Sequence, residues 1–191
     1  MEARICRECL GYTLFELMFG LLLTALLMSW AVPGLHSLMQ QSRITAANNH
    51  FLVLLEQSRY RALALRIPVT ICTSLDALHC NRNQGEHVLV FEDANENGFL
   101  DEHETLVAKD RIFDGGDFWL VWRSFRQTDY LRWAVGGRTD SMNGTYTLCN
   151  RAYRDDWLRQ IVINRAGRSR VTHPSRNGES ILLAARKACA T

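Results

Sequence analysis

The sequence contains none of the short motifs that mark the common catalytic sites. It has no nucleophile-elbow motif, no phosphate-binding glycine loop and no paired carboxylates placed for acid–base chemistry. Its six histidines show no spacing typical of zinc ligands. An internal repeat and a low-complexity tract are also missing. We therefore expect that the chain is not an enzyme.

Lysine is nearly missing as well, since 20 of the 22 basic residues are arginine. The net charge of the whole chain is only +2, but it is unevenly placed. Residues 151–191 hold nine basic and three acidic side chains, which gives +6, whereas residues 1–150 carry −4. This asymmetry predicts a basic C-terminal segment that meets an anionic partner.

Charge is almost absent from Leu14 to Val32, where Glu16 is the only ionisable side chain in 19 residues. At a rise of about 1.5 Å per residue, a helix of this length crosses the ~30 Å hydrocarbon core of a bilayer. A secretory signal is shorter and ends at a small-residue cleavage site, which this run lacks. A plain signal anchor is the alternative, but a carboxylate within a membrane segment usually marks a function.

The residues from Gly11 to Glu16, together with Pro33, resemble the prepilin N-terminus of type IV pilins and type II secretion pseudopilins. The resemblance implies that a prepilin peptidase cuts after Gly11 and that the new N-terminal residue, Tyr12, is then methylated. Tyr12 stands where the family usually has phenylalanine. Glu16 would pair with the N-terminal amine of a neighbouring subunit during assembly, because neither charge is stable alone in an apolar core.

The rest of the chain predicts a helix followed by strands. Apolar residues recur at helical spacing over residues 34–67, and Pro68 should end that helix. Residues 68–191 contain short runs typical of β-strands, at 69–72, 87–91, 105–107, 118–122, 131–134, 145–148 and 160–163.

This layout resembles the GspH/FimT pseudopilin family. The resemblance implies an α+β pilin fold, in which a long N-terminal helix packs on an antiparallel β-sheet head. Residues 1–11 would be the leader peptide and residues 12–33 the transmembrane and filament-core helix. An amphipathic helix over 34–67 and a β-rich head over 68–191 would follow.

Cysteine usage fits an exported chain. Two of the six cysteines lie in the expected leader, and an even number remains for an oxidising compartment. Four cysteines allow three pairings. We favour Cys72 with Cys80, which closes a short loop, and Cys149 with Cys189, which ties down the C-terminus.

Residues 93–104 match the calcium-loop spacing D-x-[DN]-x-[DN]-G-x5-E. The flanking sequence predicts strands rather than the two helices of an EF-hand. We therefore favour a hairpin turn held by Asn and Asp side chains, and calcium remains the alternative. The metal ligands would come from Asp93, Asn95, Asn97, Phe99, Asp101 and Glu104, with Phe99 supplying its carbonyl oxygen.

The segment Gly167-Arg168-Ser169-Arg170 is expected to carry the function. If it is extended, Arg168 and Arg170 point the same way, and their forked donors suit phosphate oxygens. It resembles the G-R-x-R motif of FimT-type minor pilins, which implies binding of double-stranded DNA in natural transformation. The alternative is that these arginines are solvated or pair within the fibre. The expected DNA-binding residues are Gly167, Arg168, Arg170, Arg165, Arg176 and Arg154.

Together these features predict a minor pilin that holds DNA without reading its sequence. The subunit would first be a single-pass protein of the bacterial inner membrane, with a periplasmic head, and would then join a type IV pilus on the cell surface. Its partners would be double-stranded DNA, other major and minor pilins, and the prepilin peptidase that also methylates. The alternative is a structural minor pilin or type II secretion pseudopilin that primes or caps a fibre.

Overall fold

The computed structural model describes residues 12–81, 85–113, 116–152 and 154–190. The expected leader and Gly11 lie outside these residues. The chain divides into two compact units, residues 1–43 and residues 44–191. One helix, α1 (Leu14–Leu65), contributes to both units.

A capping box begins α1. Thr13 Oγ1 accepts a hydrogen bond from the Glu16 amide at 3.2 Å, and Glu16 Oε2 accepts one from the Thr13 amide at 3.3 Å. The helix ends at Leu65, because Arg66 has a positive φ of 55° and Pro68 follows. The expected end before Pro68 is therefore confirmed.

The first part of α1 is long and apolar enough to cross a membrane. Every residue from Leu14 to Val32 is exposed in the isolated chain, and the helix is unbroken through Pro33. Such an exposed apolar surface requires lipid or other protein around it.

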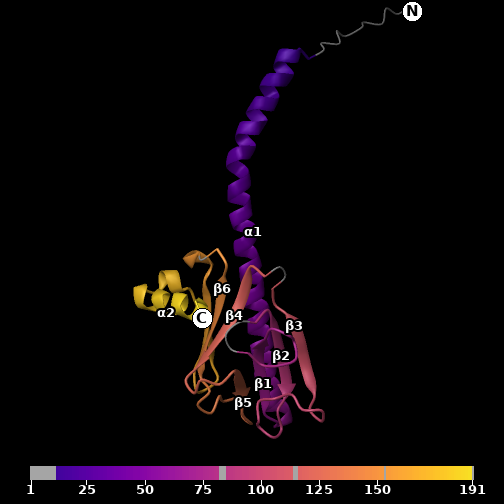
Figure 1. Cartoon of the computed structure of the whole chain (residues 1–191), viewed down its shortest axis with the longest axis vertical. Coiled ribbons are helices and arrows are strands. Elements are labelled where there is room, and N and C mark those ends of the chain that lie inside the picture. Colours follow the sequence, from indigo (N-terminus) through magenta and orange to yellow (C-terminus); the bar gives the residue numbers. More distant parts are fainter. Residues whose placement is uncertain (1–11, 82–84, 114–115, 153, 191) are drawn as a thin grey trace, which may run out of the picture. The chain divides into compact units, whose positions relative to one another are not determined.

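The β-rich part of the chain forms two four-stranded antiparallel sheets, seen in Figure 1. The first has the order β3-β2-β1-β5 and the second the order β4-β6-β7-β8. The expected strands are all present, and β8 continues the chain beyond them. The strands are β1 (Val69–Ser74), β2 (His87–Glu92), β3 (Leu106–Arg111), β4 (Phe118–Ser124), β5 (Tyr130–Trp133), β6 (Gly144–Asn150), β7 (Arg159–Ile163) and β8 (Ser169–Thr172).

The core of the second unit lies where the C-terminal half of α1 meets the inner faces of both sheets. Phe51 of α1 is fully buried, and its ring packs edge-on against Tyr146 with centroids 4.7 Å apart. Trp133 of β5 donates from its indole nitrogen to Ser58 of α1 at 2.8 Å. These contacts fix both sheets to one face of the helix.

A second helix, α2 (Glu179–Cys189), was not expected from the sequence. It packs on the second sheet, where Ala185 joins a small buried cluster with Val121 and Leu158. The disulfide Cys149–Cys189 joins the end of the helix to β6.

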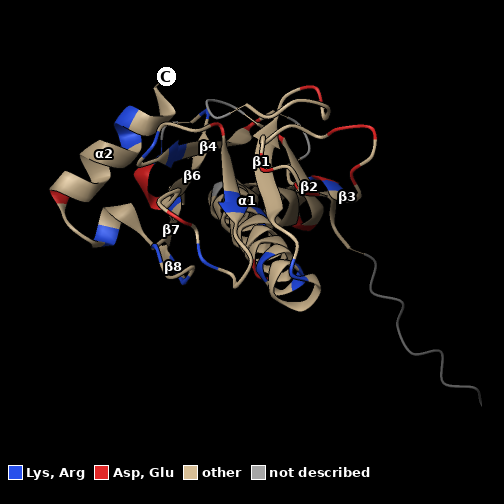
Figure 2. Ribbon diagram, turned by 90° about the horizontal axis from the view of Figure 1, so that it is seen from below, with Lys and Arg blue, Asp and Glu red and all other residues tan. Residues whose placement is uncertain are grey.

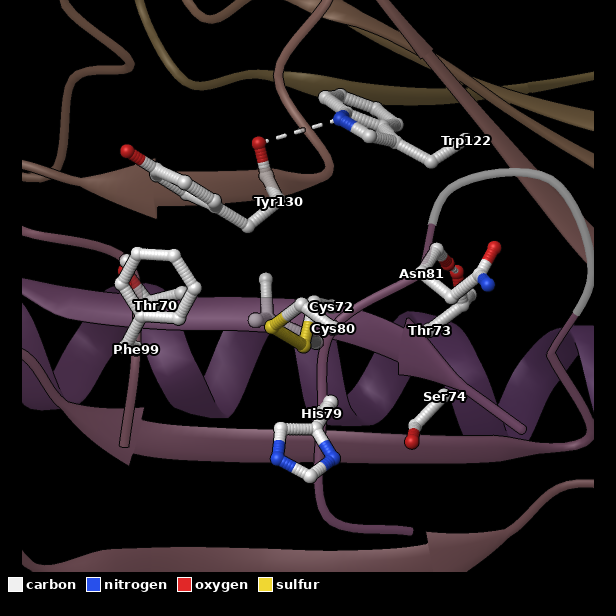
Figure 3. The surroundings of a disulfide bond; sticks show 12 residues. Thr70, Cys72, Thr73, Ser74, His79, Cys80, Asn81, Phe99, Trp122 and Tyr130 are labelled. Carbon is white, nitrogen blue, oxygen red and sulfur yellow. Dashed lines mark hydrogen bonds between the residues drawn. A yellow bond between two sulfur atoms is a disulfide. The ribbon is translucent and has the colours of Figure 1, made fainter. Parts of the chain in front are cut away.

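The second disulfide, Cys72–Cys80, joins β1 to the segment that follows it. In Figure 3 it lies beside the ring of Tyr130, and Cys80 and Tyr130 pack on a cluster that contains Cys72 and Phe91. Both disulfides are those favoured by the sequence. The α+β pilin architecture is likewise confirmed.

Candidate nucleic-acid interface

The hairpin β7–β8 presents the G-R-x-R segment. Residues Asn164 to Arg168 form the turn of this hairpin. The Gly167 amide donates to the Asn164 carbonyl at 2.9 Å, and Asn164 Oδ1 accepts the Arg168 amide at 2.9 Å. Gly167 has a φ of +78°. This is a tight turn followed by a glycine in the left-handed region, which closes a hairpin with a bulge.

Gly167 is also needed because of its surroundings. A Cβ at this position would lie 2.1 Å from the Gly137 carbonyl oxygen and 3.1 Å from the Trp133 ring. No residue with a side chain fits that space without movement of the backbone. The glycine of the motif is therefore fixed by packing as well as by its φ.

The hairpin tip is fastened to α1. Arg59 donates from Nε to the Gly137 carbonyl at 3.0 Å and from its guanidinium to the Ala166 carbonyl at 3.3 Å. Ser169 donates its hydroxyl hydrogen to Glu56 of α1. These contacts hold the turn against the helix and fix the residues that precede β8.

Arg170 lies on the outer face of the second sheet. In the register of β7 and β8, Arg170 lies opposite Val162. The preceding residue, Ser169, lies opposite the buried Ile163. Because side chains alternate along a strand, Arg170 points away from the core. Arg168, two residues earlier, is exposed as well and lies in the turn just before β8.

Four guanidinium groups of this region have no carboxylate partner in the described part of the chain. They lie along the turn, the edge strand β8 and the short 3-10 helix η2 (Pro174–Arg176) that follows it. Figure 2 shows blue positions on the ribbon near the label of β8. Within the described residues, no side-chain hydrogen bond or ion pair is made by Arg165, Arg168, Arg170 or Arg176.

The positive field continues at the base of the hairpin. Arg159 is buried, and its guanidinium is held by the carbonyls of Asp156 at 2.7 Å and Leu158 at 2.9 Å. Burial, and then the charge of Arg176, lower the pKa of Arg159. Burial also lowers the pKa of His173, with Arg159 and Arg176 adding to the effect. Positive charges so close together favour an anion nearby, and the Asp156 carboxylate already acts on Arg159.

Arg154, the remaining expected DNA-binding residue, is placed differently. Its guanidinium bonds both oxygens of Asp156, at 3.2 and 2.9 Å, and lies 4.8 Å from the centre of the Trp157 ring. The hydrogen bond to Asp156 raises the pKa of Arg154. Its charge is thus already neutralised within the molecule, and we leave it out of the interface.

Sequence reasoning missed the residues that position the interface. Arg59 and Glu56 hold the tip from α1, and neither has a signal in the sequence because their partners lie more than 75 residues away. Asn164 was missed too, although an asparagine three residues before a glycine is a turn signal that could have indicated it. The expected site residue Tyr12 is exposed, and Glu16 caps its own helix.

The long apolar helix and the antiparallel head define a pilin-like protein. Residues 47–167 match the family described as type II transport protein GspH. That match covers more than half of the sequence, so the chain belongs to the GspH family. The family and the fold are those of structural pilins rather than enzymes. They indicate a membrane-anchored pilin or pseudopilin that associates with other pilins.

Comparison with solved structures gives a similar fold. One crystal structure of the type IV minor pilin FimU from Pseudomonas aeruginosa is 16% identical, with a TM-score of 0.51. The match covers 69% of this chain and 89% of that one. A second crystal form of FimU is 18% identical over 69% and 91% of the two chains, with a TM-score of 0.47. No curated protein matches the chain.

Proposed function

We propose that this chain is a minor pilin that binds double-stranded DNA through the edge of its second sheet. Arg168 and Arg170 are the central contacts, and Arg165 and Arg176 extend the surface on either side. Binding is to phosphate oxygens and does not depend on the base sequence. Through it, the subunit supports DNA uptake in natural transformation.

The observation that carries the proposal is the set of four guanidinium groups without a carboxylate partner among the residues that the structure describes. Surface arginines are often paired, and in this chain Arg154 and Arg186 bind Asp156 and Asp155. The four interface arginines make no such pair within the described residues. Their forked donors remain available for phosphate.

A gel-shift titration with the full-length protein in neutral detergent tests the assignment. The variant is Arg168→Gln/Arg170→Gln, and the control is Arg66→Gln/Lys109→Gln, which removes the same charge from the residue after α1 and from β3. We expect the first variant to lose at least about tenfold in affinity at low salt. The plot of log affinity against log salt concentration has a negative slope, and the magnitude of that slope should also decrease by about 1.8.

The outcomes separate the competing explanations. An equal loss in both double variants would mean that only net charge matters, and the interface would be wrong. No binding by the wild-type protein would favour a structural subunit. Duplexes of different sequence should bind alike, since these arginines lie on a turn, an edge strand and a single turn of 3-10 helix, and none of these is a long helix that could enter the major groove.

A structural role in secretion is the second candidate. The family description names type II transport, which favours a pseudopilin that primes or caps a fibre. In that case deletion of the chain would abolish fibre assembly, and the Arg168→Gln/Arg170→Gln variant would assemble normally and have no phenotype.

Either role requires the same maturation. We propose cleavage after Gly11, methylation of Tyr12 by the same prepilin peptidase, and a stay in the bacterial inner membrane before assembly. Glu16 would then exchange its bond to the Thr13 amide for the amine of a neighbouring subunit. Intact mass of the protein made with and without the peptidase tests this. An unchanged mass would refute the cleavage.

A further inference from the structure

The loop between β2 and β3 is closed on itself by its last acidic residue. Glu104 accepts the Ala94 amide on Oε1 at 3.0 Å and the Asp101 amide on Oε2 at 3.2 Å. The chain turns at Gly98, whose φ is +77° and which packs against the ring of Tyr130. Residues far apart in the loop are therefore held close together.

Two asparagines inside the loop form successive side-chain turns. Asn95 Oδ1 accepts the Asn97 amide at 3.1 Å, and Asn97 Oδ1 accepts the Phe99 amide at 2.8 Å. Both side-chain amides donate to Asp101 Oδ2, at 2.7 and 2.9 Å. These bonds are what a purely structural hairpin turn requires.

The hydrogen bonds of this turn leave one buried carboxylate oxygen, on Asp93, without a partner among the described residues. Asp93 is 0% exposed, and its Oδ2 accepts bonds from the Thr70 hydroxyl at 2.6 Å and from the Gly98 amide at 3.1 Å. Its Oδ1 is buried and has no hydrogen-bond partner among the residues that the structure describes. A buried carboxylate oxygen without a partner is costly. The Gly98 amide inside the loop bonds the other oxygen of the same carboxylate, which ties Asp93 to the loop.

We propose that the loop binds one calcium ion and that Asp93 Oδ1 is a ligand. The loop spacing supplies the others: side-chain oxygens of Asn95, Asn97 and Asp101, the Phe99 carbonyl, and both oxygens of Glu104. All are hard oxygen donors, three of them carboxylates. Arg132 is the nearby cation, with its guanidinium 4.0 Å from Asp93 Oδ2 and 3.3 Å from Glu96.

Binding changes the loop locally. Among the residues that the structure describes, no three acidic, histidine or cysteine side chains are gathered as a ready metal site. The amides of Asn95 and Asn97 must rotate to turn their oxygens inward, which also releases Asp101. A site that closes in this way suits calcium, which accepts six to eight oxygens in flexible geometry, better than magnesium, which needs a near-ideal octahedron.

The test uses the full-length protein in neutral detergent, freed of divalent ions and then titrated with calcium chloride. We expect heat of binding by calorimetry, with a dissociation constant of about 10⁻⁴–10⁻³ M, as in extracellular modules. At a hundredfold excess over that constant, the melting temperature should rise by roughly 5–10 °C.

Glu104→Gln removes a ligand charge, and Glu102→Gln removes the same charge from a position in the same loop that is not a ligand. The first variant should weaken calcium binding at least tenfold, and the second should leave it nearly unchanged. The proposal is overturned if the wild-type protein shows neither heat nor a shift in melting temperature. It is overturned as well if the two variants respond alike, or if magnesium chloride gives the same response as calcium chloride.

Discussion

Replacement of Gly167 by alanine tests whether the hairpin tip is fixed by its packing. The φ of +78° costs a residue with a side chain about 1–3 kcal/mol. The added methyl would lie 2.1 Å from the Gly137 carbonyl oxygen and 3.1 Å from Trp133, and such overpacking costs about 1–3 kcal/mol more. We therefore expect the free energy of unfolding to fall by roughly 2–6 kcal/mol.

Gly136→Ala is the matched control. Gly136 also has a positive φ, +101°, but a Cβ there would meet nothing within 4 Å. Gly136→Ala should lower the free energy of unfolding only by the cost of the positive φ, about 1–3 kcal/mol. Urea denaturation of both full-length variants, compared by midpoint and slope, measures the difference. Equal losses in the two variants would refute the packing argument. DNA affinity should fall in Gly167→Ala alone, although no charge changes.

Further predictions concern the core, the disulfides and pH. Phe51→Ala should lower the free energy of unfolding by about 3–5 kcal/mol, because the ring is fully buried. By loop entropy, Cys149→Ala should cost about 4 kcal/mol and Cys72→Ala about 2.5 kcal/mol, since the disulfides span 40 and 8 residues; the same urea assay ranks them. The hydrogen bond from Arg186 lowers the pKa of Asp155. That pair stabilises the fold above about pH 4 and is lost as pH falls through the lowered pKa. The difference in melting temperature between wild type and Asp155→Asn should therefore shrink from pH 7 toward pH 3.

The sequence predicted those parts of the fold that depend on local pattern. Helical periodicity and Pro68 gave the end of α1, and the strand runs were found because they are short, apolar and bounded by turns. The division into two sheets was out of reach, because β1 pairs with β5 and β4 with β6 across long stretches of chain. Such pairings depend on packing against α1, and the sequence of a single strand does not indicate its partner.

The C-terminal helix was missed for a related reason. Its N-cap is Gly178, which makes no side-chain capping bond, so the usual start signal is absent. What holds α2 in place lies elsewhere in the chain: the disulfide from Cys149 and the bond between Arg186 and Asp155. Contacts of this kind become visible only when the sheet that receives the helix is known.

For the candidate interface, the sequence likewise did not show which charged side chains are already paired. The basic segment and its G-R-x-R turn were evident, but a count of arginines does not tell which of them are already neutralised. Arg154 bonds Asp156, two residues away, while Arg168 is left without a carboxylate within the described residues. The nearest helix places Glu56 close to the tip, and that carboxylate accepts the Ser169 hydroxyl. The fold thus fastens the hairpin with a neutral donor from Ser169 and with backbone carbonyls. The guanidinium groups of the tip therefore take no part in the contacts that hold the hairpin in place.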